Sequence, residues 1–295
     1  MRGWLSVVAF IGVAAVVFAA GGDYLKFVAA YVMMWSLAVW GAQLLLRYGL
    51  VNFGIGGAYA VGGYAAGLLY RHFGIAEVTL HILTAVVAAG LWGLLSGVVS
   101  ARVRGVQYAL LNLALSMVLY SILLKFYWAT GGSDGLYVPL PRFFDASLGD
   151  LGLYLLALFF ATAWMTLGLV YSQSAAARLA DGVRINELRV SALGAHINRQ
   201  IAAASALASV SAGLGGLGVA YVTSHVSPHY AHWSTSGELV VAALLSNFLP
   251  QPWGFVAGAA AYQAVRLFSL QFVTPELFVG VALLATLGLW RYYRR

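Results

Sequence analysis

The sequence predicts an all-α fold, a polytopic bundle of about ten transmembrane helices, with nine as the alternative count. Three observations support this prediction. Of the 295 residues, 62% are hydrophobic and only 8% are charged, and the mean hydropathy is +0.87. Soluble domains carry about a quarter charged residues, so a soluble fold could not cover this much apolar surface. Cysteine is absent from the sequence, which excludes disulfides and thiolate metal sites.

Ten apolar stretches divide the chain. A helix needs about 20 apolar residues to cross the hydrocarbon core of a membrane. The predicted spans are residues 4–20, 25–46, 50–70, 78–100, 105–128, 151–172, 197–223, 237–249, 253–272 and 276–290. The eighth is short and is followed by Pro250 and Pro252, so it is either a half-helix or a re-entrant segment buried against its neighbours. Residues 1–295 are therefore expected to form a single transmembrane domain.

The first stretch also has the outline of a secretory signal peptide. Arg2 precedes an apolar run that ends in the small residues Ala19, Ala20 and Gly21. The basic region is minimal and no Ala-x-Ala cleavage site is clean, so an uncleaved first helix is the favoured interpretation.

Basic residues divide unequally between the two ends of the ten predicted spans. With the N-terminus inside, eleven lie at cytoplasmic ends and five at outer ends. The inner set is Arg2, Arg47, Arg102, Arg104, Arg178, Arg184, Arg189, Arg199, Arg291, Arg294 and Arg295; the outer set is Lys26, Arg71, Lys125, Arg142 and Arg266. Because cytoplasmic loops are richer in basic residues, both termini are predicted inside. The scatter of these charges between apolar runs argues against nucleic-acid binding.

Three polar stretches connect the spans. Residues 129–150 and 224–236 are expected outside, and residues 173–196 inside. Charged residues recur at helical spacing in the inner stretch, which predicts a short amphipathic helix along the membrane face, in contact with lipid. They are Arg178, Asp181, Arg184, Glu187 and Arg189.

Small residues follow one another at four-residue spacing in the third span. Gly54, Ala58, Gly62 and Ala66 form a ridge on which the backbone of another helix can approach closely. Helix packing alone explains this spacing. A role in lining a translocation path is an additional hypothesis.

The run from Gly213 to Gly218 formally matches the dinucleotide-binding pattern G-x-G-x-x-G. That fold needs a strand, a turn and a soluble helix, whereas the preceding run is an Ala/Ser-rich membrane helix without a strand signal. We therefore interpret Gly213 and Gly216 as another close-packing face, with the same alternative of a place on the translocation path.

Two further groups are candidates for chemistry. His225, His229 and His232 have a spacing that could bring two imidazoles together, but no carboxylate stands nearby, so no metal site is predicted. Glu238 opens an otherwise uncharged span, where a carboxylate needs a hydrogen-bond partner or a proton. Capping or pairing at the helix start is as good an explanation as contact with cargo.

Enzyme signatures are missing from the sequence. Neither the phosphate-loop pattern G-x-x-x-x-G-K-[ST] nor the patterns H-E-x-x-H and G-x-S-x-G occur. No cofactor is predicted, and if ATP drives this protein, another subunit must bind it.

Several segments, in order, resemble the LivM-like permeases of branched-chain amino-acid ABC importers, over roughly residues 45–270. The glycine ridge of the third span is similar to that family's Gly-rich early helix. The other matching segments are residues 104–111 (RGVQYALL), 130–136 (TGGSDGL), 184–187 (RINE) with 192–194 (ALG), 236–239 (SGEL), and Trp253-Gly254 with Gly258-Ala259. Two departures are Ile185, where the family has an acid, and Ser246-Asn247-Phe248-Leu249, where it has a glycine turn.

The resemblance implies a permease that catalyses no covalent change. It implies pairing with a second, homologous permease, two ATP-binding-cassette ATPases inside and a periplasmic solute-binding protein outside, in the inner membrane. Residues 174–196 would be the cytoplasmic coupling loop that docks on the ATPase. Its candidate residues are Arg184, Asn186, Glu187, Ala192, Leu193 and Gly194.

The same resemblance implies which substrates are transported. Branched-chain or other small amino acids are expected, with urea and short amides as alternatives. A membrane scaffold or an intramembrane enzyme is the rival class, disfavoured because paired intramembrane acids or histidines are lacking.

Overall fold

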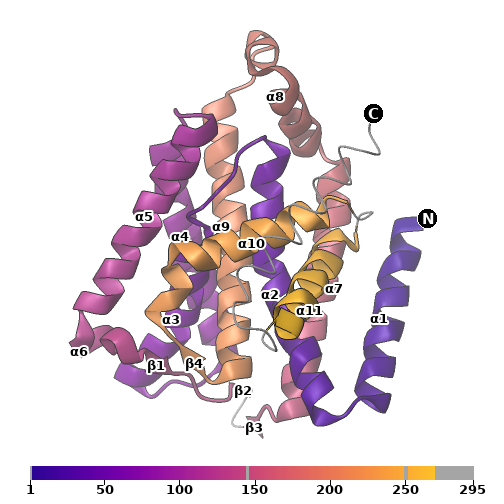
Figure 1. Cartoon of the computed structure of the whole chain (residues 1–295), viewed down its shortest axis with the longest axis vertical. Helices are drawn as coiled ribbons and strands as arrows, with labels where there is room; N and C mark the ends of the chain where they lie inside the picture. The colour runs from indigo at the N-terminus through magenta and orange to yellow at the C-terminus, as the bar shows by residue number, and fades with distance from the viewer. Residues whose placement is uncertain (1, 144–145, 249–251, 270–295) are drawn as a thin grey trace.

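A computed structural model describes residues 2–143, 146–248 and 252–269. They fold into a helical bundle with two short β-ribbons at one end (Figure 1). The main helices are α1 (Arg2–Ala20), α2 (Asp23–Arg47), α3 (Ile55–Phe73), α4 (Val78–Ser100), α5 (Gly105–Lys125), α7 (Asp150–Gln173), α8 (Ala175–Ala192), α9 (Ile197–Thr223), α10 (Trp233–Ser246) and α11 (Gly254–Ser269). The predicted span 276–290 lies outside the described residues.

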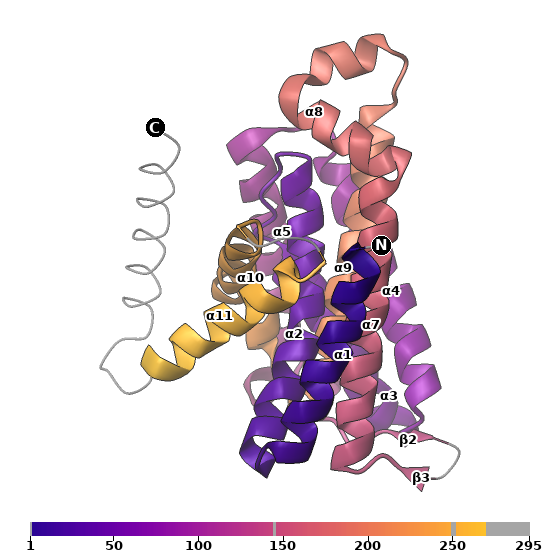
Figure 2. The ribbon, with the colours of Figure 1, turned by 90° about the vertical axis from the view of Figure 1, so that its right-hand side faces the viewer.

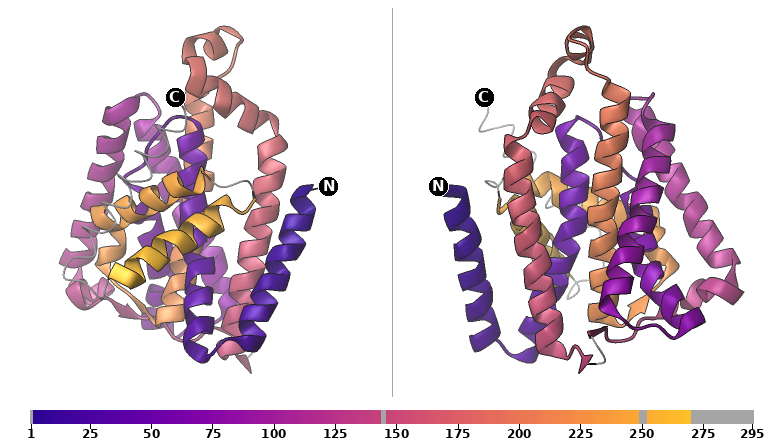
Figure 3. Two further views of the ribbon diagram at one scale, coloured as in Figure 1. Left: turned by 45° about the vertical axis from the view of Figure 1, so that its right-hand side comes forward. Right: turned by 180° about the vertical axis from the view of Figure 1, so that it is seen from behind.

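Helix α9 occupies the centre of the bundle. Its sequence is rich in alanine, serine and glycine, so neighbouring backbones can approach it from several sides. Helices α2, α3 and α4 pack against it, as the views from two sides show (Figure 3). Gly41 of α2 lies against Ala208, and Gly93 of α4 lies against Ser209. The core of the molecule is thus built from small side chains around one long helix.

Five of the described helices are long and apolar enough to cross a membrane: α2, α4, α5, α7 and α9. Their bounds agree with the predicted spans within a few residues. Large apolar side chains such as Leu91, Val98 and Phe159 are exposed along α4 and α7, as expected for surfaces that face lipid. The structure therefore supports a helical membrane bundle, while the count of ten and the orientation stay predictions.

The polar stretches 129–150 and 173–196 lie at opposite ends of the bundle (Figure 1). The first contains α6 (Tyr127–Thr130), η1 (Gly132–Asp134), β1 (Leu136–Tyr137), β2 (Arg142–Phe143) and β3 (Ala146–Ser147). β1 pairs antiparallel with β4 (His225–Val226), and β2 pairs antiparallel with β3. Helix α8 rises from the other end, beyond the tips of the bundle helices (Figure 2). This arrangement fits the predicted placement of the two stretches on opposite sides.

The third span begins later than predicted. Helix α3 starts at Ile55, and residues 48–54 form turns and irregular backbone after α2. Asn52 fixes this entry, because its Oδ1 accepts a hydrogen bond of 2.8 Å from the Gly54 backbone nitrogen. Gly54 itself lies outside the helix, pressed against the Asn112 carbonyl of α5. The hydropathy of residues 50–54 therefore reflects burial of a non-helical segment.

Residues 224–236 were expected to form an outer loop, and this prediction is wrong for much of the segment. After β4, residues Pro228–Ala231 form the 3₁₀ helix η2, with Pro228 and Ala231 buried, and α10 begins at Trp233. Ser116 of α5 donates a hydrogen bond of 2.7 Å to the Ala231 carbonyl. The physical reason is that these polar groups find partners inside the protein, so they do not need water.

Helices α10 and α11 pack against each other on one side of the bundle (Figures 1 and 2). Both contact α2, through pairs such as Trp35 and Tyr262, whose stacked rings lie 5.3 Å apart. α10 has only 14 residues, which at 1.5 Å per residue is about 21 Å and too short to cross a 30 Å core upright. This fits the short eighth segment that the sequence predicts.

Candidate functional site

The segment that projects farthest from the bundle is α8, which we call the coupling arm (residues 175–194). Ser174 caps its first half by accepting a hydrogen bond of 3.2 Å from Ala177. At Asn186 the backbone leaves the helical region (φ −158°, ψ 97°), and the Asn186 side chain caps the second half by accepting 3.0 Å from the Arg189 nitrogen. The arm is thus two helical pieces joined by a bend at Asn186.

Two bidentate ion pairs hold the arm to the bundle. Arg47, at the end of α2, donates to both oxygens of Asp181 at 2.7 and 2.8 Å. Arg104, just before α5, donates to both oxygens of Glu187 at 2.7 and 2.8 Å, and also to Asn198 of α9 at 2.9 Å. Planar two-point contacts of this kind fix direction as well as distance. The arm therefore has a defined orientation relative to α2, α5 and α9.

Three large apolar side chains of the arm are exposed, and together we call them the tip. Ile185, Leu188 and Leu193 have exposed fractions of 83, 83 and 84%, whereas Ala180 and Val183 on the inner side are buried. Helix α8 projects beyond the end of the bundle opposite the β-ribbons (Figure 1), the end at which Arg47 and Arg104 hold it. Apolar side chains gathered on a polar projection are typical of a protein-binding surface.

The candidate residues of the predicted coupling loop all lie on this arm. Arg184 is exposed beside Gly49, where it lines a hollow with Arg47 and Asp181. Ala192 ends the helix, Leu193 follows it, and Gly194 has a φ of +89° that closes the arm. Glu187 points back to Arg104, a partner within this chain that sequence reasoning did not find.

The small-residue candidates lie in the contact between α3 and α9. Gly62 touches the Gly213 backbone, and Gly216 touches the Tyr59 carbonyl, so closely that a Cβ at either glycine would overlap backbone atoms. The Ala58 carbonyl also lies next to Gly213, and Ala66 is fully buried. Residues 213–218 form the interior of α9, with no strand or phosphate-binding turn. A place for these residues on a translocation path stays a prediction.

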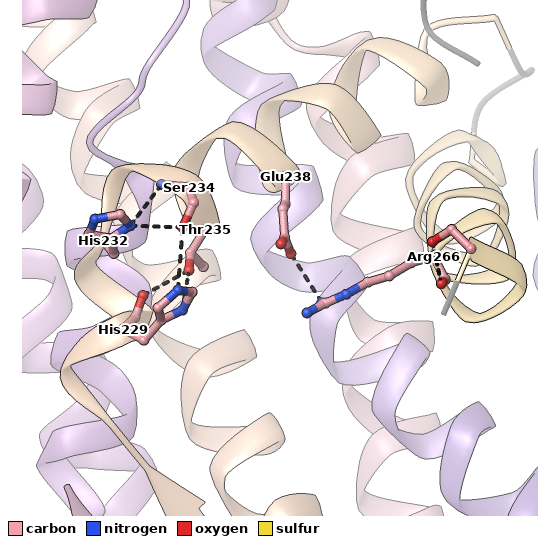
Figure 4. A network of polar contacts seen from close by, with 7 residues as sticks. His229, His232, Ser234, Thr235, Glu238 and Arg266 are labelled. Carbon is pink, nitrogen blue, oxygen red and sulfur yellow. Dashed lines mark hydrogen bonds and ion pairs between the residues drawn. The ribbon is translucent and has the colours of Figure 1, made fainter. Parts of the chain in front are cut away.

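Glu238 lies in the second turn of α10, and its partner is Arg266 of α11, at 3.2 Å between Oε2 and Nη1 (Figure 4). The side chain at the start of α10 is His232, which caps the helix, so Glu238 has the pairing role and not the capping role. Arg266 was assigned from the sequence to an outer end, whereas it lies next to Glu238 within the helical pair α10–α11. The sequence signal for this pair was a charged residue, Arg266, inside the predicted apolar span 253–272.

The three histidines separate into two environments. His229 and His232 stack with ring centres 5.4 Å apart; Ser234 contacts both rings, and Thr235 contacts His229 (Figure 4). His225 instead hydrogen-bonds the Asp134 carbonyl at 2.8 Å. Within the described part of the chain, no three His, Asp or Glu side chains gather as a metal site would require.

Comparison with known proteins identifies the family. The model of the permease component of branched-chain amino-acid transport systems matches residues 24–289. The chain belongs to this family. This is the family of the permease components of branched-chain amino-acid transport systems, and the five long apolar helices agree with a multi-pass membrane protein.

Two curated relatives are similar over a shorter region. The permease protein LivM of the high-affinity branched-chain amino-acid transport system of Salmonella typhimurium is 34% identical over 97 residues, and that of Escherichia coli is 33% identical over 97 residues. Each alignment covers 32% of this chain and 23% of the relative. The chain thus matches about a quarter of the length of these relatives. No solved structure matches.

Proposed function

We propose that this chain is the permease subunit of an ATP-binding-cassette importer that carries branched-chain or other small amino acids across the inner membrane. The observation that supports it best is the coupling arm, an apolar-tipped projection fixed by two bidentate ion pairs, in a chain of this permease family. A second, homologous permease, two ATPases and a periplasmic binding protein complete the transporter. ATP hydrolysis belongs to the ATPases.

The proposed mechanism is mechanical. The ATPase binds the tip through Ile185, Leu188 and Leu193, and its closure displaces the arm. Asp181 and Glu187 transmit this displacement to α2 and α5 through their arginine partners, and α9 follows the arm directly in the chain. These helices then tilt and expose the path alternately to the two sides of the membrane.

The tip provides the test of this function. Leu188→Asp places a charge in the proposed apolar contact, which costs about 2 kcal/mol or more. We expect the ATPase to be lost on co-purification and ATP-driven uptake of leucine by the reconstituted transporter to fall at least about tenfold. Membrane insertion and thermal stability of the permease should stay unchanged, because the side chain is 83% exposed.

Leu188→Met is the matched control, since it keeps an apolar side chain of similar volume at the same place. It should retain both the ATPase and uptake. Normal uptake by Leu188→Asp, with its ATPase still bound, would show that the arm does not couple the two subunits.

A further inference from the structure

The Glu238–Arg266 pair differs from the other ion pairs in its place. Among the described residues, the remaining charged side chains lie towards the two ends of the bundle, near the strands or near the coupling arm. Glu238 and Arg266 instead lie near Tyr31. Tyr31 is the ninth residue of α2, about 12 Å along the axis from Asp23. The pair therefore lies beside the interior of a helix that is long and apolar enough to cross a membrane, and we infer that it is at membrane depth.

Its geometry differs from that of the two pairs of the coupling arm and resembles that of Lys26 with Asp23, a single contact of 3.2 Å. The pairs of the coupling arm are bidentate, at 2.7 and 2.8 Å, whereas Glu238 and Arg266 meet through one contact of 3.2 Å. The side chains are 25 and 40% exposed in this chain. Figure 4 shows them reaching towards one another from α10 and α11. Both side chains are thus partly accessible.

A charged pair in this position needs a reason. Charged groups at membrane depth are costly, and in membrane proteins they face the interior or a water-filled path, where they mark the route of a substrate. A purely structural link between two helices would be made at lower cost by apolar side chains, because replacing an ion pair with packed hydrophobic groups is often neutral or stabilising. Gln43 and Asn247 already join α2 to the end of α10 without charge, at 3.1 Å.

We propose that Glu238 and Arg266 form a binding site for the zwitterionic head of an amino acid during translocation. The guanidinium fork of Arg266 accommodates the α-carboxylate in a two-point contact, and Glu238 pairs with the α-ammonium group. Between transport cycles the two side chains neutralise each other, so neither charge is left alone at membrane depth. The site rests on the proposed transport function and specifies its substrate class.

This site would separate amino acids from the uncharged alternatives. Urea and short amides carry no formal charge, so such a molecule could not replace the charges that Glu238 and Arg266 present to each other. In an amino acid, the α-carboxylate takes the place of the Glu238 carboxylate at Arg266, and the α-ammonium group takes the place of the guanidinium at Glu238. The pair thus favours zwitterions over urea on electrostatic grounds.

The test uses the complete transporter in proteoliposomes with ATP, and radiolabelled L-leucine and urea as probes. Glu238→Gln with Arg266→Gln removes both charges, so no uncompensated charge remains and assembly should be retained. We expect leucine uptake to fall at least about tenfold, with binding-protein-stimulated ATP hydrolysis within about twofold of the unsubstituted transporter. Leucine uptake equal to that of the unsubstituted protein would show that the pair is only a helix link.

Arg266→Lys decides the matter if the double variant fails to assemble. It keeps the charge and loses the planar fork, so a structural pair would leave uptake nearly unchanged, whereas a carboxylate-binding arginine would lose about tenfold. Asn247→Ala is the matched control, because it removes an uncharged link between α2 and α10 and should transport normally.

The outcomes for the unsubstituted transporter separate the two proposals. Absence of any ATP-driven uptake of leucine or urea would contradict the proposed function. ATP-driven uptake of urea without leucine would leave the import function in place and overturn the zwitterion site.

Discussion

Helix α9 and the coupling arm are held in place by opposite means. Around α9, backbones meet with no side chains between them, as at Gly62 and Gly213, and little of the helix is exposed. The arm is exposed over much of its surface and is fixed by Asp181 and Glu187 through charged contacts. Close packing resists deformation, whereas a projection held by discrete pairs can transmit a displacement as a unit.

Under the proposed function, the comparison predicts where motion enters the bundle. Arg47 ends α2, Arg104 precedes α5, and the arm continues into α9 at Ile197. A force on the arm would therefore reach three helices at their ends, and we expect the packed centre to move as a body. Substitutions in the two regions should fail differently: those in the centre by loss of the fold, those in the arm by loss of coupling.

The largest effect is expected in the centre, from Gly62→Leu. A Cβ at this position would already overlap the Gly213 backbone, and a leucine side chain would force α3 and α9 apart. Overpacking of this kind costs about 1–3 kcal/mol or more, so the yield of folded protein should fall at least about tenfold. Size-exclusion chromatography in detergent, with thermal unfolding of the remaining protein, measures the loss.

Gly12→Leu is the control for this substitution. Gly12 lies on exposed α1, and a Cβ there meets no atom within 4 Å. This variant should fold and transport normally. A folded, fully active Gly62→Leu protein would show that the α3–α9 contact opens without cost and that the centre is not the rigid part.

An intermediate effect is expected in the arm, from Glu187→Lys. The lysine loses the two hydrogen bonds from Arg104 and adds a repulsion between like charges. A partly exposed pair contributes up to about 1 kcal/mol, and the repulsion adds a similar amount, so uptake should fall about tenfold or more. The ATPase should co-purify less well, while membrane insertion stays intact.

A charge exchange separates the two explanations of this effect. Glu187→Arg with Arg104→Glu re-forms an ion pair between the same positions, so a clamp within the chain predicts partial recovery of uptake. If Glu187 instead pairs with a basic group on the ATPase, the exchange should stay inactive. Uptake by the exchanged variant that is no higher than uptake by Glu187→Lys would therefore argue against the clamp.

The sequence predicted the long helices well and the contacts between distant segments poorly. Spans 78–100 and 197–223 match α4 and α9 residue for residue, because a continuous apolar run has few alternatives in a membrane. The late start of α3 and the inward course of η2 were missed. Both depend on partners such as Asn112 and Ser116 that lie far away in the sequence, and hydropathy carries no information on pairing.

The same limit applies to the candidate sites. The sequence located the arm, because a charged stretch lies between two apolar ones, but it predicted one short helix along the membrane face and not a projection with a bend at Asn186. The partners of Glu187 and Glu238 were not, because one sequence cannot show which of sixteen basic residues approaches which acid. The exposed tip residue Ile185 was noted only as a departure from the family pattern, although it is 83% exposed.

The smallest effect is expected at the end of the arm, from Gly194→Ala. Gly194 has a φ of +89°, which an L-residue adopts at a cost of about 1–2 kcal/mol, but a Cβ there meets no atom within 4 Å. The strain is local to an exposed turn, so we expect less than about fivefold loss of uptake and no change in the unfolding temperature of the bundle. Gly194→Asn is the matched variant, since asparagine tolerates this region better and should lose less. If the ATPase contacts Gly194 directly, the larger asparagine should reduce uptake more than alanine does. The variant with the lower uptake therefore decides between backbone strain, where it is Gly194→Ala, and a buried contact, where it is Gly194→Asn.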